Sequence, residues 1–251
     1  MIEAIRKEIG GRECLIYDCG SSDTLLIQPV DDHDIDVLDS EVAEIKRLLG
    51  ESAGSGEGTD TAEVCAGFTL AAFRVNDWND DLSPWQAPAV FGDKGFGGGA
   101  ESTLEYIEKV LVPELTGGRG PVFQSSGSTE EDGLQVFIGG YSLAAFFALW
   151  AVYQTDLFSG AAAASPSVWF PGWIDFAEKN AVRSGRVYLS LGDKEEKTRN
   201  PVMRTVGDNL RKQHELLLAD PRVECRLEMN QGNHFKEADI RTAKGFAWLL
   251  K

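Results

Sequence analysis

Basic residues are scarce in this 251-residue sequence: Lys and Arg number 24 against 40 Asp and Glu, which gives a formal net charge of −16. A surface of this charge repels phosphate backbones and anionic lipid headgroups, so neither nucleic acid nor membrane is expected as a partner. Long apolar runs are also absent. The longest, Leu143 to Tyr153, has 11 residues, well short of the ~20 that a membrane-spanning helix needs.

Cysteine is rare too, and its spacing excludes the common metal-binding patterns. The chain has no C-x-x-C pair, and a metal site is not expected. We expect reduced structural thiols at all four positions, Cys14, Cys19, Cys65 and Cys225. The amino terminus lacks an apolar stretch followed by a small-residue cleavage site, so the sequence predicts a cytoplasmic protein.

With 43% apolar residues, the chain is long enough to bury one substantial core, and we predict a single domain over residues 1–251. Residues 1–66 form its acidic amino-terminal portion. An apolar stripe there predicts a helix whose acidic side chains face water; its members are Leu38, Val42, Ile45 and Leu49. The small, polar segment Ser52 to Thr59 is predicted to be a flexible loop.

The rest of the sequence alternates short apolar runs with longer helical ones, which is typical of a largely parallel sheet covered by helices on both faces. The predicted strands are Thr24–Gln28, Phe68–Phe73, Leu134–Ile138, Gly160–Ala164, Arg186–Leu191 and Val223–Met229. The predicted helices are Leu104–Leu115, Leu143–Tyr153, Val202–Leu218 and Ala238–Leu250. The last strand alternates apolar and charged residues, as expected at a sheet edge.

One strand runs through the turn Gly139-Gly140-Tyr141-Ser142-Leu143-Ala144 directly into an apolar helix. A serine in such a turn projects its hydroxyl from the carboxyl end of the sheet, in the arrangement called a nucleophile elbow. The pattern here is G-x-S-x-A, so Ala144 replaces the usual second glycine. A serine after two glycines is often only a turn residue, but this strand-to-helix context favours a catalytic Ser142.

A serine nucleophile needs a base, and the chain has three histidines. His33 precedes the first predicted helix in an acid-rich segment, where a surface role is expected. His214 lies inside a predicted helix. His234 follows the edge strand in a Gly- and Asn-rich turn, and loops at the carboxyl edge of a parallel sheet commonly hold catalytic groups. We therefore predict His234 as the base.

The order serine, acid, histidine requires a carboxylate between these two residues, at the end of a late strand. The segment after the strand Arg186–Leu191 supplies Asp193 and Glu195. Asp193 is the more usual residue type. We favour Glu195, because it stands where the loop has turned back toward His234, but only the loop geometry decides between them.

The backbone amide of Leu143, directly after the serine, is expected to donate to an oxyanion. The second donor is placed near Trp78, in the loop that follows the strand Phe68–Phe73. Aromatic side chains are unusually frequent in this loop and in the segment 165–173, which predicts a pocket for a small apolar or aromatic acyl group. The predicted substrate-binding residues are Tyr141, Trp85, Phe96 and Trp169.

These motifs, in this order, resemble the esterase branch of the α/β-hydrolases, which includes esterase D, feruloyl esterases and the enterobactin-type siderophore esterases. The resemblance is in GGYSLAAFFALWAVYQTDLFSGAAAASPSVWF, SLGDKEE and GNHF, and covers about residues 67–251. It implies an α/β-hydrolase fold without a large separate lid domain, and a triad of Ser142, Glu195 or Asp193, and His234. Relatives in which this strand ends in G-x-x-D carry their aspartate at the position of Glu195.

The sequence thus predicts a serine carboxylic-ester hydrolase that acts on a small-molecule ester without a cofactor. Acyl transfer or thioester cleavage on the same triad is an alternative, and so is a non-catalytic binding protein that keeps the fold. The exposed edge strand and the surplus of tryptophans are compatible with a homodimer.

Overall fold

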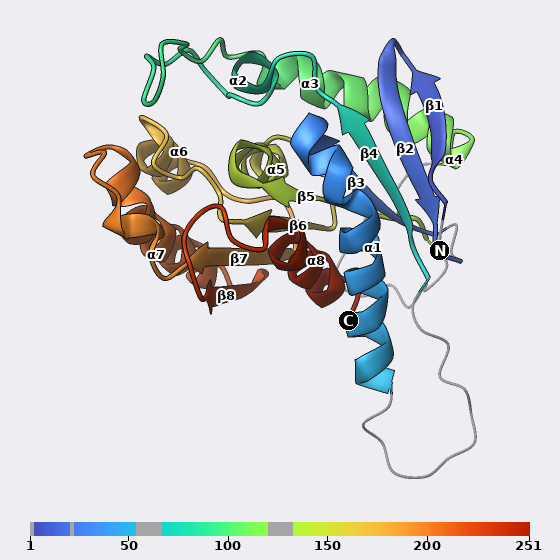
Figure 1. Ribbon diagram of the computed structural model, residues 1–251. Coiled ribbons are helices and arrows are strands. Elements are labelled where there is room, and N and C mark those ends of the chain that lie inside the picture. Colours follow the sequence, from blue (N-terminus) through green and yellow to red (C-terminus); the bar gives the residue numbers. More distant parts are fainter. Residues whose placement is uncertain (1–2, 21–22, 54–66, 120–132) are drawn as a thin grey trace.

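The computed structural model describes residues 3–20, 23–53, 67–119 and 133–251, with the side chains of 51–53 left aside. Its centre is an eight-stranded sheet of order β1-β2-β4-β3-β5-β6-β7-β8 (Figure 1). The strands are β1 (Ile5–Ile9), β2 (Arg12–Asp18), β3 (Thr24–Val30), β4 (Thr69–Arg74), β5 (Gln135–Tyr141), β6 (Gly160–Ala164), β7 (Arg186–Gly192) and β8 (Glu224–Asn230). From β4 to β8 all neighbouring strands are parallel.

All six predicted strands are present, with ends shifted by at most three residues, and Gly160–Ala164 is as predicted. The strand predicted for the edge, β8, does lie at the edge beside β7. Exposed and half-buried residues alternate from Glu224 to Leu227, as the alternating sequence indicates, but the alternation ends there, because Glu228 is half-buried and Met229 is exposed.

Sequence analysis missed the hairpin of β1 and β2, which extends the sheet at the other edge. These strands pair antiparallel, and β2 also pairs antiparallel with β4. The turn between them is Gly10-Gly11, and both glycines have positive φ (57° and 80°). Two consecutive positive φ values suit the right-handed twist of a tight hairpin. The Gly-Gly pair between β-forming residues was the feature of the sequence that could have indicated this hairpin.

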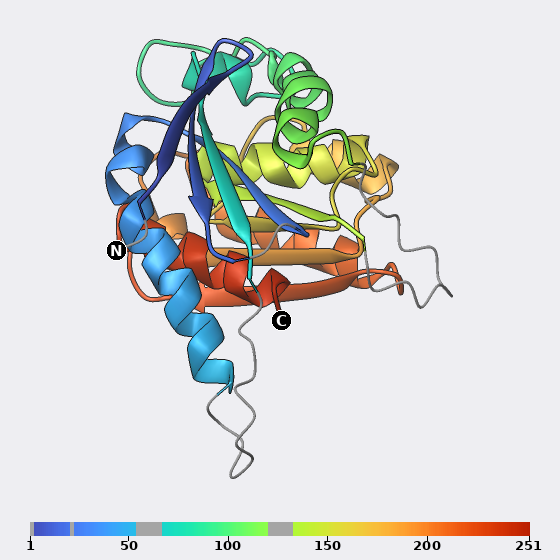
Figure 2. The ribbon, with the colours of Figure 1, turned by 90° about the vertical axis from the view of Figure 1, so that its right-hand side faces the viewer.

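Helices cover both faces of the sheet. The helices are α1 (Asp32–Ala53), α2 (Trp78–Asp81), α3 (Ala100–Tyr106), α4 (Val112–Thr116), α5 (Ser142–Gln154), α6 (Trp173–Lys179), α7 (Val206–Leu218) and α8 (Ala238–Leu249). Helices α1 and α8 pack together on one face, and α5 lies on the other (Figures 1 and 2). None of the helices in the described ranges is both long and apolar enough to cross a bilayer.

Some predicted bounds need correction. Helix α1 begins at Asp32, so His33 lies in its first turn and not before it. The first two residues of the predicted loop Ser52–Thr59 belong to α1; its remainder, like Cys65, lies outside the described residues. The predicted helix Leu104–Leu115 is divided by a π-helical turn over Ile107–Leu111. Pro113 lies in the first turn of α4 and lacks a backbone N–H, which accounts for the broken hydrogen-bond ladder.

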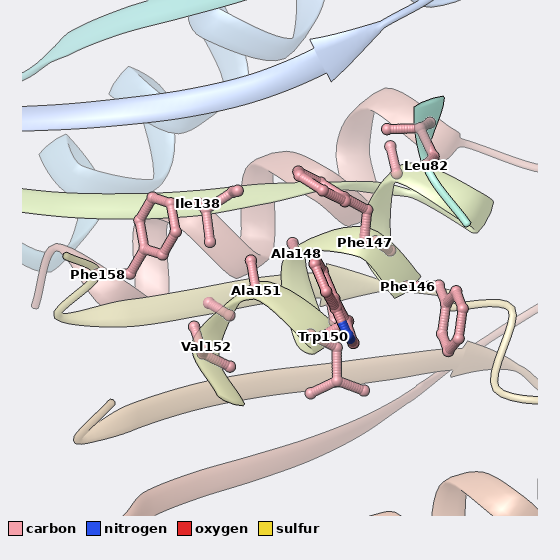
Figure 3. Packing of buried hydrophobic residues seen from close by; sticks show 14 of the residues in the cluster. Leu82, Ile138, Phe146, Phe147, Ala148, Trp150, Ala151, Val152 and Phe158 are labelled. Carbon is pink, nitrogen blue, oxygen red and sulfur yellow. The ribbon is translucent and has the colours of Figure 1, made fainter. Parts of the chain in front are cut away.

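Helix α5 forms the centre of the larger core. Every residue from Leu143 to Tyr153 is buried, because the sheet lies on one side of this helix and other helices and loops cover the rest. Its side chains Phe146, Phe147 and Trp150 belong to this cluster (Figure 3). Phe146 stacks on Phe170 with ring centroids 5.0 Å apart, and it makes an edge contact with Trp173. The residue that begins α5, Ser142, is therefore held by a rigid element.

A buried carboxyl between α1 and the sheet is expected to limit stability at high pH. Glu41 is 3% exposed, and its Oε2 accepts a hydrogen bond from Gln28 Nε2. Among the described residues neither Glu41 Oε1 nor Gln28 Oε1 has a partner. Burial raises the pKa of Glu41 well above its usual value, and the charges of Asp34 and Asp239 add to this shift.

The unfolded chain loses the Glu41 proton near pH 4.5, whereas the folded protein keeps it. The free energy of unfolding therefore falls as pH rises from that value until Glu41 itself ionises. At pH 8 the free energy of unfolding of Glu41→Gln is expected to exceed that of the native protein by about 1–3 kcal/mol. The amide of the new glutamine also offers a donor to Gln28 Oε1. Near pH 4.5 the expected gain in the free energy of unfolding is small.

Urea unfolding at both pH values measures this difference, with Asp36→Asn, an exposed change on the same helix, as the control. Equal gains at both pH values would contradict the ionisation argument.

Candidate active site

The site begins at the turn between β5 and α5. Ser142 has φ of +57°, a left-handed backbone conformation that a non-glycine residue rarely adopts. A Cβ placed on Gly140 would lie 2.8 Å from the Cβ of Ala144, so this turn depends on the missing side chain at Gly140. One methyl group at Ala144 fits because of that glycine, and the G-x-S-x-A pattern still forms the sharp strand-to-helix turn.

The structure brings together the three residue types predicted from sequence. His234 Nε2 lies 2.9 Å from Ser142 Oγ, and His234 Nδ1 lies 2.7 Å from Glu195 Oε2. Ser142 comes from the end of β5, Glu195 from the loop after β7, and His234 from the loop between β8 and α8. All three loops lie at the carboxyl edge of the parallel strands, where strand ends converge.

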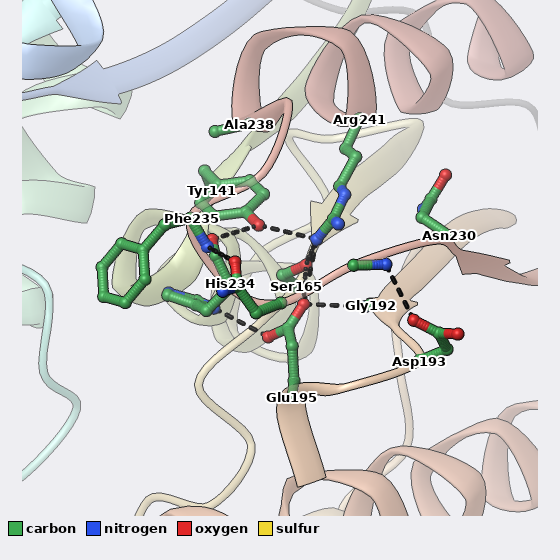
Figure 4. A network of polar contacts seen from close by, with 12 residues as sticks. Tyr141, Ser165, Gly192, Asp193, Glu195, Asn230, His234, Phe235, Ala238 and Arg241 are labelled. Atoms are coloured by element: carbon green, nitrogen blue, oxygen red, sulfur yellow. Dashed lines mark hydrogen bonds and ion pairs between the residues drawn. The ribbon is translucent and has the colours of Figure 1, made fainter. Parts of the chain in front are cut away.

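Asp193 lies elsewhere in the loop after β7, so the structure distinguishes between the two carboxylates that the sequence offered as partners of His234. Its Oδ1 accepts the backbone N–H of Gly232 at 2.7 Å, and the backbone N–H of Asp193 donates to Asn230 O at 2.8 Å (Figure 4). Asp193 thus ties the β7 loop to the β8 loop, while Glu195 alone of the two contacts the imidazole.

The Glu195 carboxylate is buried, and each of its oxygens has a distinct set of partners. Oε1 accepts hydrogen bonds from Gly192 N at 2.7 Å and Ser165 Oγ at 2.8 Å, whereas Oε2 faces His234. Burial raises the pKa of Glu195, but the hydrogen bonds from His234, Ser165 and Gly192 outweigh it, and the pKa is lowered overall. The carboxylate is therefore ionised at neutral pH.

A buried arginine, which sequence analysis missed, completes this network. Arg241 of α8 is 1% exposed, and its Nη1 lies 3.0 Å from Glu195 Oε1 and 3.0 Å from the hydroxyl of Tyr141 (Figure 4). The same Nη1 is 3.3 Å from Ser165 Oγ. Nothing local in the sequence distinguishes Arg241 from a surface arginine of an amphipathic helix.

Tyr141, predicted to contact substrate, supports the histidine loop. Its hydroxyl donates to the backbone carbonyl of His234 at 2.8 Å and accepts from Arg241. Burial, together with the negative charge of Glu195, raises the pKa of Tyr141 to about 12. The hydroxyl therefore keeps its proton and can donate to His234 throughout the neutral range.

The second loop beside Ser142 follows β6. The backbone N–H of Ser167 donates to the carbonyl of Ser142 at 3.1 Å, and the two hydroxyl oxygens lie 3.5 Å apart. Ser165 has a left-handed φ of +47°, which is a strained conformation for serine. The sequence drew attention to this segment for its aromatic residues and not for its serines.

Neither of the two amides predicted as oxyanion donors donates to an acceptor among the residues that the structure describes. The amide of Leu143 lies in the first turn of α5, where backbone N–H groups have no acceptor within the helix. In the stretch 75–81, which the structure describes fully, every amide except that of Trp78 donates to an acceptor within the protein.

Three of the four predicted aromatic residues, Trp85, Phe96 and Trp169, belong to one cluster, but only Trp169 lines the pocket beside His234. This pocket has a volume of about 220 Å³ and is also lined by His234 and Phe235. Phe96 packs against Trp169 with ring centroids 6.0 Å apart. Trp85 does not line the pocket; its Nε1 donates to Pro171 O, and its ring packs against Phe170.

The other two histidines lie elsewhere. His33 is exposed at the start of α1, and His214 is half-buried in α7, where burial lowers its pKa. Over the described ranges, no three His, Cys, Asp or Glu side chains are grouped so as to hold a metal ion.

No protein-family model and no curated protein matches this sequence. Solved structures do resemble it. An IroE-like serine hydrolase from Shewanella oneidensis has a TM-score of 0.69 at 16% identity, covering 99% of this chain and 80% of its own. A ferulic acid esterase has a TM-score of 0.60 at 12% identity, covering 100% and 99%.

An enterochelin esterase from Shigella flexneri has a TM-score of 0.61 at 13% identity, over 98% of this chain and 58% of its own. The chain has an α/β-hydrolase fold. Within this fold, the Ser142 turn, the Glu195 loop and the His234 loop follow β5, β7 and β8 in the order that the sequence predicted.

Proposed function

We propose that this α/β-hydrolase is a serine carboxylic-ester hydrolase that acts through an acyl-enzyme on Ser142. The observation that carries the proposal is the hydrogen-bonded chain Ser142–His234–Glu195, with separations of 2.9 Å and 2.7 Å. Both distances suit proton transfer. The resemblance to solved esterases and serine hydrolases supports the same reaction class.

In this mechanism His234 removes the proton of Ser142 as Oγ attacks the ester carbonyl, and then returns that proton to the leaving alcohol. Glu195 holds Nδ1–H, so that Nε2 is the free base, and stabilises the imidazolium that forms. The amides of Leu143 and Trp78 stabilise the oxyanion. A water molecule, activated by the same imidazole, then hydrolyses the acyl-enzyme.

Tyr141, Ser165 and Arg241 are positioning residues in this proposal. Ser165 and Arg241 orient the carboxylate of Glu195 by its Oε1, while Tyr141 holds the backbone of His234. Each acts on a residue of the triad and not on the substrate. Asp193 positions the loops through Gly232 and needs no role in proton transfer.

The pocket of about 220 Å³ beside His234 fits a small acyl or aryl ester. Trp169 forms part of its wall, and Phe96 and Trp85 support that wall from within the aromatic cluster. We propose that these side chains set the size of the group accepted.

Intact-mass analysis after incubation with a fluorophosphonate tests the proposed function. We expect one covalent adduct on the native protein, none on Ser142→Ala, and a much slower reaction on His234→Ala. Turnover of a panel of esters graded by acyl size then defines the substrate range.

No adduct on any of the three proteins would overturn the triad mechanism and favour a non-catalytic binding protein. An adduct accompanied by efficient trapping of the acyl-enzyme by an added alcohol or amine would instead indicate an acyltransferase.

A further inference from the structure

The pocket beside the triad is lined on one side by cationic side chains. Lys194 and Lys197 come from the loop after β7, and they face a pocket whose apolar walls include Trp169, Met203 and Phe235. Phe235 is 90% exposed, although it is a large aromatic residue next to the catalytic base. An exposed ring at a pocket mouth is suited to cover a bound organic group.

The same segment holds an uncompensated positive charge. Lys194, Lys197, Arg199 and Arg204 are all exposed, and none forms an ion pair with any acid that the structure describes. Two of the three acids of this segment are paired with arginines from other elements, Glu195 with Arg241 and Glu196 with Arg211. Asp193 forms no ion pair with any base that the structure describes, so one unpaired acid stands against four unpaired cations.

This local positive charge stands against a net charge of −16 for the chain. Elsewhere in the described residues, most basic side chains are paired with acids. An anion bound at the pocket mouth would therefore contact unpaired cations close to the triad. Low-dielectric walls strengthen such an attraction relative to open water. The net charge alone would instead predict poor binding of anionic substrates.

The position of the pocket relative to the imidazole indicates which half of an ester it receives. In the proposed reaction the Oγ–acyl bond forms, the bond between the acyl carbon and the alcohol oxygen breaks, and the proton of Ser142 passes through His234 to that oxygen. The leaving alcohol therefore lies on the imidazole side of Oγ. Asn233, His234 and Phe235 line this pocket, whereas Leu143, the proposed oxyanion donor, does not.

We infer that the substrate is an ester whose alcohol half carries a carboxylate, bound by Lys194 and Lys197 beneath Phe235. This inference rests on the proposed esterase function and adds the substrate class. The ammonium groups act as point charges on flexible stems, which suits a carboxylate on a small organic body between Trp169 and Phe235.

Two matched esters test the inference: 4-acetoxyphenylacetate and its neutral primary amide, 4-acetoxyphenylacetamide. They share the acyl group, and their phenol leaving groups are closely similar. For the native enzyme we expect kcat/KM about tenfold higher for the carboxylate, mainly through KM, and a smaller preference at high salt. The double variant K194Q/K197Q is expected to lose this preference through a fall of about tenfold in kcat/KM for the carboxylate ester.

The double variant K46Q/K251Q provides the matched control. It removes the same amount of charge from two exposed lysines that do not line the pocket, and we expect it to keep the preference. A loss in both variants would mean that general charge and not this pocket selects the substrate, and would overturn the inference.

A second readout does not depend on acceptance of the acetyl group. The product 4-hydroxyphenylacetate is expected to slow fluorophosphonate labelling of the native enzyme but not of K194Q/K197Q, and 4-hydroxyphenylacetamide is expected to slow neither. Equal turnover of the two esters, or equal protection by the two phenols, would overturn the inference and leave the esterase function standing. Failure to form any adduct would overturn the function and this inference with it.

Discussion

Glu195→Gln is expected to lower kcat for ester hydrolysis by about 10⁴-fold, whereas Asp193→Asn is expected to have little effect. Oε1 of Glu195 is surrounded by three donors: Gly192 N–H, Ser165 O–H and Arg241 Nη1. An amide NH₂ cannot occupy that place, so glutamine must direct its carbonyl oxygen there and its NH₂ toward His234.

The NH₂ group requires an acceptor, and it therefore holds Nδ1 of His234 without a proton. Nε2 then carries the proton and can no longer accept the proton of Ser142. The wrong tautomer, and not a lost contact alone, is the reason for so large an expected effect.

Asp193→Asn is the matched control, because an asparagine Oδ1 still accepts the N–H of Gly232. Steady-state kinetics on both variants, with circular dichroism to verify folding, measures the comparison. A larger loss in Asp193→Asn than in Glu195→Gln would transfer the acid's role to Asp193.

Arg241→Met is expected to lower the free energy of unfolding by about 3–5 kcal/mol at neutral pH. The change removes the cation from a buried ion pair in which both side chains are almost fully buried, at 1% and 4% exposed. It leaves the Glu195 carboxylate in the core with fewer donors, and it leaves the backbone carbonyl of Gln231 without its arginine Nη2 donor. Methionine fills much of the volume, so the loss reflects charge and hydrogen bonds.

Urea unfolding followed by circular dichroism measures this loss. Arg211→Met is the control: Arg211 also pairs with two acids, Glu196 and Asp208, but on the surface, where such pairs contribute about 0–1 kcal/mol. A positioning role predicts in addition that Arg241→Lys restores part of kcat and moves the pH profile of kcat back toward that of the native enzyme. Equal stabilities of the two Met variants would exclude a structural role for the buried pair.

Most of the sheet and the nucleophile turn could be predicted from the sequence because their signals are local. A short apolar run bounded by glycines indicates a strand, and Gly139 to Ala144 between a strand and an apolar helix indicates a sharp turn. The hairpin of β1 and β2 was missed because its outer strand is mostly exposed and charged, with Arg6, Lys7 and Glu8 in succession. Edge strands of this kind have no apolar pattern to detect.

The choice between Glu195 and Asp193 is a case in which residue type and spacing were insufficient. Both follow β7 within three residues, and the one that faces the imidazole depends on how the loops after β7 and β8 approach each other. Arg241 was missed for a related reason. Its role depends on packing against β5, β6 and the β7 loop, which lie up to 100 residues earlier in the chain.

The sequence by itself determined the six parallel strands from β3 to β8, the turn that presents Ser142, and the serine, histidine and carboxylate candidates, because each of these is set by neighbours along the chain. Only the tertiary structure decided which carboxylate contacts His234, which buried arginine pairs with that carboxylate, and where unpaired lysines gather beside the site. These depend on distances between loops far apart in the sequence, and electrostatic and hydrogen-bond energies fall steeply over such distances.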